Sequence, residues 1–192
     1  MKKSTTRAFL IILVLVVGVV GYFAYLSGKS RDAAKDAAMT ATQIVLSRDL
    51  QNNYPSTVKE VVKYYADIQK CFYAEGCTEE EVEQLGMKAR ELYDADLLAI
   101  NDVTSNLLQL KVELDTFKKD SRQITAAAVA SSANVDTFTE DGYEFARIHC
   151  TYTVLEGGKS NLVDTVYLLR RDENRRWKIY GWDLANNVNP AD

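Results

Sequence analysis

The sequence predicts an α+β domain that one N-terminal transmembrane helix holds at a membrane. Three patterns in the chain of 192 residues lead to this prediction. A long uncharged apolar run comes first, apolar residues at helical spacing follow it, and the last third of the chain alternates with a period of two. We therefore expect three to four helices packed on one face of a four-stranded, curved antiparallel meander with a cone-like shape.

The apolar run covers residues 8–26, which include no charged side chain. A helix that crosses a bilayer core needs about 20 apolar residues, and this run has nearly that length without a polar face. A cleavable signal peptide is the alternative, but its apolar region is usually shorter and is followed by a small-x-small site. Residues 24–28 match such a site poorly. We therefore predict an uncleaved anchor.

Charges on the two sides of the run predict its orientation. Lys2, Lys3 and Arg7 precede the run with no acid among them, whereas acids are interleaved with the bases that follow it. By the positive-inside rule, residues 1–7 form a cytoplasmic tail and the C-terminal domain is extracytoplasmic. The three bases contribute +3 to a net charge of −4, so the remainder carries −7. Such an acidic domain is a poor partner for nucleic acid or for anionic lipid.

Capping signals place the first helices. We predict a juxtamembrane helix and a linker over residues 27–54, with the helix itself over 31–50, and the α+β domain over 55–192. Thr57 and Glu60 form a capping box, in which each side chain accepts a hydrogen bond from an amide of the first turn. The helix that they start has one apolar face, formed by Val58, Val61, Val62, Tyr65, Ile68 and Phe72.

Two more helices follow. Thr78 and Glu81 form a second capping box, and we expect its helix to run to about Asp96. Asn101 or Asp102 caps the next helix. The apolar face of this last helix consists of Val103, Leu107, Leu110, Leu114 and Phe117.

Four strands are expected over residues 123–138, 143–155, 162–171 and 176–184. The Asp-Gly pair at 141–142 is a strong hairpin signal, and short turns between all four strands indicate an antiparallel meander. In the last strand, alternation places Trp177 and Ile179 on one face, and Tyr180 and Trp182 on the other. The second strand has an apolar face formed by Ala146, Ile148, Cys150, Tyr152 and Val154.

The order of these elements and the closing sequence Trp-Lys-Ile-Tyr-Gly-Trp at 177–182 resemble the nuclear transport factor 2-like superfamily, over about residues 56–184. In that superfamily, helices and a bent sheet form a cone with a pocket at its wide end. Residues 54–65 and 138–143 more closely resemble a family of bacterial single-span membrane proteins of unknown function. Enzymes of the superfamily such as ketosteroid isomerase use an Asp base and a Tyr/Asp pair, which no motif here places.

Candidate residues for a pocket or an interface come from the last strands: Phe145, Arg147, His149, Tyr180 and Trp182. His149 is the only histidine, and alternation puts it on one face with Phe145 and Arg147. If that face lines a pocket, the two basic side chains are positioned to bind an anion. The alternative is a histidine on an exposed strand face, without a functional role.

Cys71 and Cys77 are candidates for a disulfide in an oxidising compartment. In one continuous helix their side chains would lie about 120° apart, so a bridge requires the helix to end by about residue 74. Otherwise both remain thiols. Cys150 is expected to be a buried thiol. The sequence has no metal-ligand spacing, phosphate-binding loop or nucleophile motif, so we expect no metal and no cofactor.

These patterns leave three functions open. The first is a membrane-anchored extracytoplasmic module that binds a small ligand or another envelope protein, without catalysis. The second is a scaffold subunit of an envelope or secretion assembly, since such subunits combine a short cytoplasmic tail, one span and an outer domain. The third is a small-molecule enzyme with a pocket in the cone. A cavity lined by converging polar groups would favour a small ligand, and an exposed apolar patch would favour a scaffold.

The first testable prediction concerns topology. Protease added to intact protoplasts should degrade the C-terminal domain, because Lys2, Lys3 and Arg7 keep the short N-terminal tail in the cytoplasm. Immunoblotting with an antibody against the domain measures the loss. Full protection of the domain until detergent is added would contradict this orientation.

Overall fold

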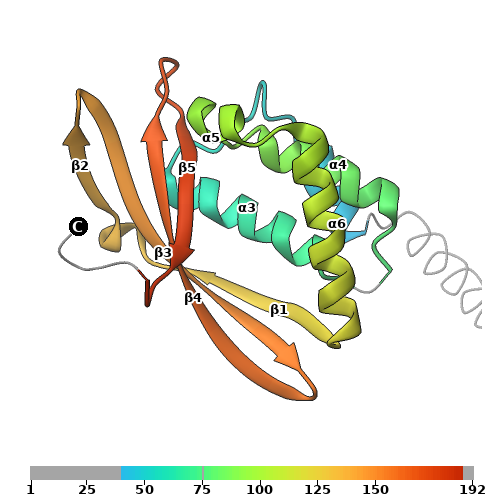
Figure 1. The fold of residues 1–192 in the computed structure, drawn as a ribbon. Coiled ribbons are helices and arrows are strands. Elements are labelled where there is room, and N and C mark those ends of the chain that lie inside the picture. The colour runs from blue at the N-terminus through green and yellow to red at the C-terminus, as the bar shows by residue number, and fades with distance from the viewer. Residues whose placement is uncertain (1–39, 75, 188–192) are drawn as a thin grey trace, which may run out of the picture. The chain divides into compact units, whose positions relative to one another are not determined.

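The computed structural model describes residues 40–74 and 76–187 (Figure 1). Five α-helices and one antiparallel sheet occur in this part of the chain, which confirms the predicted α+β class. The helices are α2 (Ala41–Ser47), α3 (Val58–Phe72), α4 (Glu79–Arg90), α5 (Ala95–Ile100) and α6 (Val103–Lys119). The strands are β1 (Arg122–Val129), β2 (Asp136–Glu140), β3 (Tyr143–Glu156), β4 (Lys159–Arg171) and β5 (Trp177–Leu184).

None of the helices described is long and apolar enough to cross a membrane. The predicted span over residues 8–26 lies outside the part of the chain that the structure describes, so it stays a prediction.

Both predicted capping boxes are confirmed. The amide of Glu60 donates to Thr57 Oγ1 over 3.2 Å, and the amide of Thr57 donates to Glu60 Oε2 over 3.1 Å. Thr78 and Glu81 make the same pair of bonds at the start of α4. Because these bonds satisfy amides that have no partner within the helix, they determine where α3 and α4 begin.

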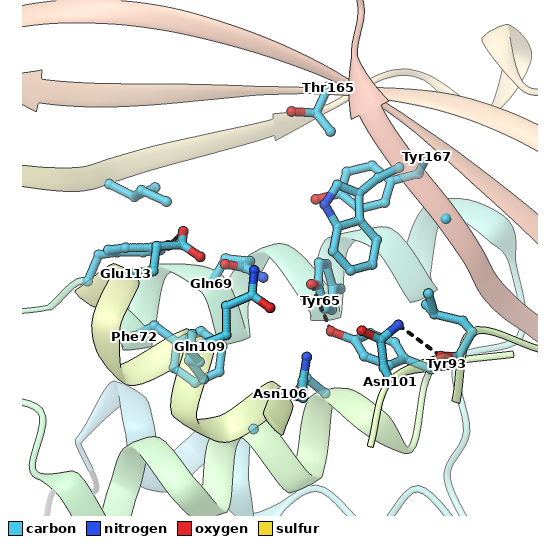
Figure 2. A pocket seen from close by; sticks show the side chains of 18 of the residues that line it. Tyr65, Gln69, Phe72, Tyr93, Asn101, Asn106, Gln109, Glu113, Thr165 and Tyr167 are labelled. Carbon is cyan, nitrogen blue, oxygen red and sulfur yellow. Dashed lines mark hydrogen bonds between the residues drawn. The ribbon is translucent and has the colours of Figure 1, made fainter. Parts of the chain in front are cut away.

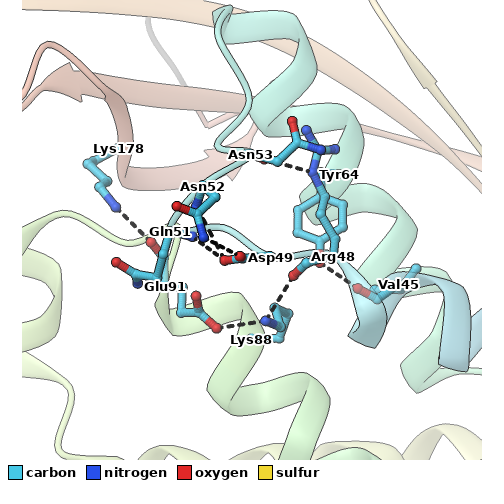
Figure 3. A network of polar contacts seen from close by, with 10 residues as sticks. All are labelled: Val45, Arg48, Asp49, Gln51, Asn52, Asn53, Tyr64, Lys88, Glu91 and Lys178. Atoms are coloured by element: carbon cyan, nitrogen blue, oxygen red, sulfur yellow. Dashed lines mark hydrogen bonds and ion pairs between the residues drawn. The ribbon is translucent and has the colours of Figure 1, made fainter.

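Helix α2 ends earlier than the predicted boundary at residue 50. After Ser47 the chain turns, because the Asp49 carboxylate accepts hydrogen bonds from the amides of Gln51 and Asn52 (Figure 3). The hydroxyl of Tyr64 in α3 donates to the carbonyl of Val45 over 2.6 Å. Helix α2 therefore belongs to the compact unit, which begins at Ala41.

The second helix of the prediction is also too long, since α4 ends at Arg90 rather than near residue 96. The backbone beyond it pairs with β5 instead: the amide of Ile179 donates to Leu92 O and the amide of Asp94 donates to Ile179 O, both over 2.8 Å. This short parallel bridge extends the sheet beside β5. The Asp94 side chain then caps α5 by accepting from the amide of Asp96.

The sheet has five strands, not four. The predicted strand over 123–138 is interrupted by a short 3₁₀-helix (Ser132–Asn134), and its two parts, β1 and β2, pair with different halves of β3. Strand β3 bends between these halves, and α3, α4 and α6 lie on the inner side of the bend (Figure 1). The order along the sheet is β1-β3-β4-β5, with β2 beside β3 as well. One straight strand cannot stay paired along such a bend.

The hairpin turns form as predicted. Between β2 and β3, Asp141 and Gly142 both have positive φ, 49° and 82°, which is the backbone of a type I′ turn. The even-numbered face of β3 is the predicted apolar one. Ala146, Ile148 and Cys150 are completely buried against the helices.

A β-bulge changes the predicted faces of β5. Leu168 pairs with Gly181 and Leu169 with Ile179, so Tyr180 is an extra residue on β5. As a result Trp182 lies on the helix side together with Ile179, whereas Tyr180 lies on the opposite side of the sheet. The prediction that Tyr180 and Trp182 share a face is therefore wrong, because an extra residue reverses the alternation beyond it.

Arg170 of β4 links the bulge to the segment after α4. Its Nε donates to Asp94 Oδ2 over 3.0 Å, and its Nη1 lies 2.8 Å from Asp96 Oδ2. The guanidinium also stacks between two rings, at 4.8 Å from Tyr143 and 4.9 Å from Tyr180. Both the Arg170 and Asp94 side chains are shielded from solvent, so each depends on the other as a counter-ion.

This pair generates a stability prediction with a matched control. Asp94→Ala should reduce the free energy of unfolding by about 3–5 kcal/mol, since Arg170 would remain buried without its main partner and α5 would lose its cap. Asp96→Ala should cost less than about 1 kcal/mol, because the Asp96 side chain is 61% exposed. Urea unfolding followed by circular dichroism measures both. Equal losses would show that Arg170 does not depend on Asp94.

Candidate functional site

A cavity of about 530 Å³ lies between the helices and the inner face of the sheet (Figure 2). Helices α3, α4, α5 and α6 supply one side of its lining, and strands β1, β3, β4 and β5 supply the other. Its volume is within the range of about 300–1,000 Å³ that is typical of small-molecule sites. The bend of the sheet holds its strands away from α6 at this point and so leaves the space open.

Aromatic rings form one end of the cavity. The ring of Tyr65 in α3 is at the centre, with centroid distances of 5.9 Å to Tyr93, 5.7 Å to Tyr167 and 5.6 Å to Trp182. The bulge at Tyr180 places the Trp182 ring here. Trp182 is still 45% exposed. A ligand in the cavity can therefore contact an open indole face that stable neighbouring rings support.

The tyrosine hydroxyls are arranged in two pairs. Tyr65 and Tyr93 are 3.1 Å apart at their oxygens, and Tyr152 and Tyr167 are 2.7 Å apart. Burial raises the pKa of all four, so they are protonated at neutral pH. In each pair one hydroxyl donates to the other, and Tyr152 is also hydrogen-bonded to the Cys150 thiol.

Polar side chains of α6 line the opposite wall. Asn106, Gln109 and Glu113 are spaced by three and four residues, so they form one stripe along the helix that borders the cavity (Figure 2). The side-chain amides of Asn106 and Gln109 make no hydrogen bond within the described residues 40–74 and 76–187. Gln69 of α3 faces them from beside Tyr65.

Glu113 is the one acid that lines the cavity within the described part of the chain, and the lining there includes no Lys, Arg or His. One Glu113 carboxylate oxygen accepts a hydrogen bond from the Tyr73 hydroxyl. Burial, then this bond to a carboxylate, raises the pKa of Tyr73. The Tyr73 ring also packs on Phe117 of α6 at 4.4 Å between centroids. This contact joins the C-terminal part of α6 to the end of α3.

The family assignment comes from the sequence as a whole. A family model described as domain of unknown function DUF6715 matches residues 1–182. The chain belongs to the DUF6715 family. No curated protein matches the sequence.

Of the five candidate residues from the sequence of this DUF6715 chain, the cavity includes Trp182 alone. The other four, Phe145, Arg147, His149 and Tyr180, belong to the face of the sheet that points away from the helices. His149 is exposed there, and its Nδ1 lies 3.0 Å from Asp164 Oδ2. The predicted grouping of Phe145 with Arg147 and His149 on one strand face is correct, but this face does not line the cavity.

The outer face of the sheet has its own small aromatic cluster. Phe145 stacks on Phe138 at 5.5 Å and meets Tyr180 edge-on at 5.5 Å. The Arg147 guanidinium lies 4.8 Å from the centre of the Phe138 ring. These contacts cover the outer side of β3 near the bulge and bury Phe145.

The structure also describes the three cysteines and the residue types that could bind a metal. Helix α3 ends at Phe72, early enough for the predicted bridge, but Cys71 and Cys77 are both free thiols in the structure. Cys150 is buried in the core, and burial raises its pKa to about 11. Within residues 40–74 and 76–187, no three His, Cys, Asp or Glu residues are grouped as metal ligands.

Most of the cavity lining was missed by sequence reasoning. Gln69, Asn106 and Gln109 are polar residues on amphipathic helices, where a solvent-facing position is the usual expectation. The three-four spacing of Asn106, Gln109 and Glu113 beside the apolar positions Leu107 and Leu110 was the one available signal. It cannot distinguish a stripe that borders a cavity from one that faces water.

The two tryptophans allow a direct stability comparison. Trp177→Ala should reduce the free energy of unfolding by about 3–5 kcal/mol, since Trp177 is 7% exposed in the core. Trp182→Ala should cost about 1–2 kcal/mol, because nearly half of its surface is already open to the cavity. Thermal unfolding of each purified variant measures the difference. Two equal and large losses would mean that Trp182 is a core residue rather than a cavity wall.

Proposed function

We propose that this DUF6715 protein is a membrane-anchored, extracytoplasmic binding module that holds a small molecule in the cavity between its helices and its sheet, without catalysis. The predicted anchor over residues 8–26 and the basic tail before it support the location. The order of helices followed by a curved antiparallel sheet supports a nuclear transport factor 2-like fold, in which such a cavity is the usual ligand site.

This proposal rests mainly on the cavity having one aromatic wall and one polar wall. The cavity has an open indole face at Trp182 and, across from the sheet, a stripe of amide side chains on α6. Small-molecule sites combine apolar and aromatic lining with a few polar groups that orient the ligand. Thr165 adds a hydroxyl from the sheet, so both walls offer hydrogen-bonding groups to a ligand.

The same lining does not favour an enzyme. Acid–base catalysis needs a titratable group within hydrogen-bond reach of the substrate. Glu113 is the one carboxylate along this cavity in the described chain, and it already accepts a hydrogen bond from Tyr73. The four buried tyrosines keep their protons at neutral pH because burial raises their pKa values. The groups present are suited to binding and orienting a molecule.

A scaffold subunit of an envelope or secretion assembly is the second candidate. Exposed apolar side chains on the outward side of α5 and α6 favour it: Ile100, Leu108 and Val112. Leu108 and Val112 are four residues apart and therefore adjacent on the helix surface. Such residues are common in protein interfaces, but scattered ones also occur on monomers. The two functions are compatible, since none of these three residues lines the cavity.

Filling the cavity tests the binding function. Gln109→Trp should place an indole in the cavity and abolish the binding of small molecules found in a ligand-observed NMR screen of uncharged and charged compounds against the full-length chain. Gln84→Trp is the matched control, because Gln84 is also exposed on a helix but does not line this cavity. A bound compound at 100 times its Kd should raise the free energy of unfolding by about 2.7 kcal/mol in the control. Compounds that bind both variants equally would contradict the proposal.

A further inference from the structure

We infer that the ligand of this cavity is an uncharged ring that carries several hydroxyl groups, as in a sugar unit. The inference rests on the proposed function, because it names the ligand class of the same site. It depends on which polar groups in the cavity are still available, where they lie, and which charges the lining presents.

Thr165 of β4 supplies one of these groups from the sheet. Its side chain is only 7% exposed, it lines the cavity, and its hydroxyl makes no hydrogen bond to any other residue that the structure describes. Figure 2 shows Thr165 above the space that Gln69 and Gln109 border from the other side. This hydroxyl can therefore form a hydrogen bond with a ligand group in the cavity.

The available groups both donate and accept hydrogen bonds. A threonine hydroxyl has a donor and acceptor lone pairs, and the Asn106 and Gln109 amides each offer an NH₂ and a carbonyl oxygen. Within the Tyr65–Tyr93 pair one hydroxyl donates to the other, so the second hydroxyl can donate to a ligand. Ligand hydroxyls match this set, because a hydroxyl can donate to one neighbour while it accepts from another.

The positions of the groups favour a hydroxylated saturated ring over a flat base. Thr165 is on the sheet, Gln69 on α3, and Asn106 on α6, so polar atoms approach the cavity from three different elements. A planar heteroaromatic molecule presents its polar atoms only along its edge. A saturated ring directs hydroxyls around its whole rim and keeps an apolar C–H face, which can lie on the open indole of Trp182.

Charge excludes phosphorylated and carboxylated ligands. No base lines the cavity within residues 40–74 and 76–187, so an anion would lose its hydration there without gaining a counter-ion. A cation has little to gain as well. Glu113 is exposed to solvent, which screens it, and it is already bonded to Tyr73. A neutral ligand therefore loses the least hydration free energy when it enters the cavity.

Fluorescence of Trp182 can test this inference on the full-length chain, kept in a detergent without a sugar head group. Trp182 lines the cavity while Trp177, the other tryptophan, is buried in the core, so a ligand should change the emission of Trp182. The probes are glucose, galactose and N-acetylglucosamine as neutral rings, glucose 6-phosphate as an anion, glucosamine as a cation, and adenine as a planar base. Trp182→Phe should lose the signal.

At least one neutral sugar should bind about tenfold or more tightly than the charged probes and adenine. Thr165→Val keeps the side-chain shape but removes the hydroxyl. It should lower the affinity for that sugar by about 2- to 10-fold, as expected for the loss of one hydrogen bond, and calorimetry measures this change. Thr151→Val is the matched control, since Thr151 lies on the neighbouring strand with its hydroxyl bonded to Asp164 on the outer face. It should leave the affinity unchanged.

The sugar can be free or can be the end of a glycan. Comparing the affinity for chitotetraose with that for N-acetylglucosamine distinguishes these sources, and a preference for either supports the ligand class. The inference is overturned if no neutral sugar binds at millimolar concentration, if a charged probe or adenine binds as tightly, or if Thr165→Val and Thr151→Val behave alike. If the sugars fail while other compounds still bind the wild type and are lost in Gln109→Trp, only the ligand class is wrong. If Gln109→Trp changes no binding at all, the proposed function itself fails.

Discussion

The bulge at Tyr180 is the constraint on which both the sheet and the cavity depend. One extra residue in β5 turns Trp182 toward the helices and Tyr180 toward the outer face. The edge of β5 beside the bulge is then covered by the chain after α4, through the two backbone bonds of Ile179. Arg170 reaches Asp94 of this covering segment and stacks on Tyr180. The bulge, the ion pair and the edge bridge therefore stabilise one another.

The bend of the sheet explains why there is space for a ligand at all. Strand β3 pairs with β1 along one half and with β2 along the other, so the sheet curves around the helices instead of lying flat against them. Helix α3 fills the inside of the curve with Val61, Val62 and Ile68, which are completely buried. Leu114 is the one buried residue of α6, and this helix borders the cavity with a polar stripe. Most of the apolar burial by these two helices therefore comes from α3, so α6 can have polar residues beside the cavity.

The two faces of the sheet differ in whether their polar side chains have partners within the domain. On the outer face, Arg147 lies on Phe138 and His149 pairs with Asp164, so the notable side chains already have partners within the domain. On the inner face, Thr165 and the amides of α6 retain hydrogen-bonding capacity. Unused hydrogen-bonding capacity along a cavity, rather than the presence of a titratable residue, marks the inner face as the candidate site.

Local signals in the sequence determined the element types, the starts of α3 and α4 at Thr57 and Thr78, and the hairpin turn at Gly142, because each depends on bonds or dihedral angles within a few residues. Tertiary structure alone decided where α4 ends, that the strand after residue 122 is divided, and that Trp182 points inward. Each of these depends on a partner distant in sequence: Ile179 for the chain after α4, the bent β3 for β1 and β2, and Leu168 for the bulge. A β-bulge is defined by the register between two paired strands, so the alternation of residues within one strand cannot show it. The position of Trp182 in the cavity lining therefore depends on how β5 pairs with β4.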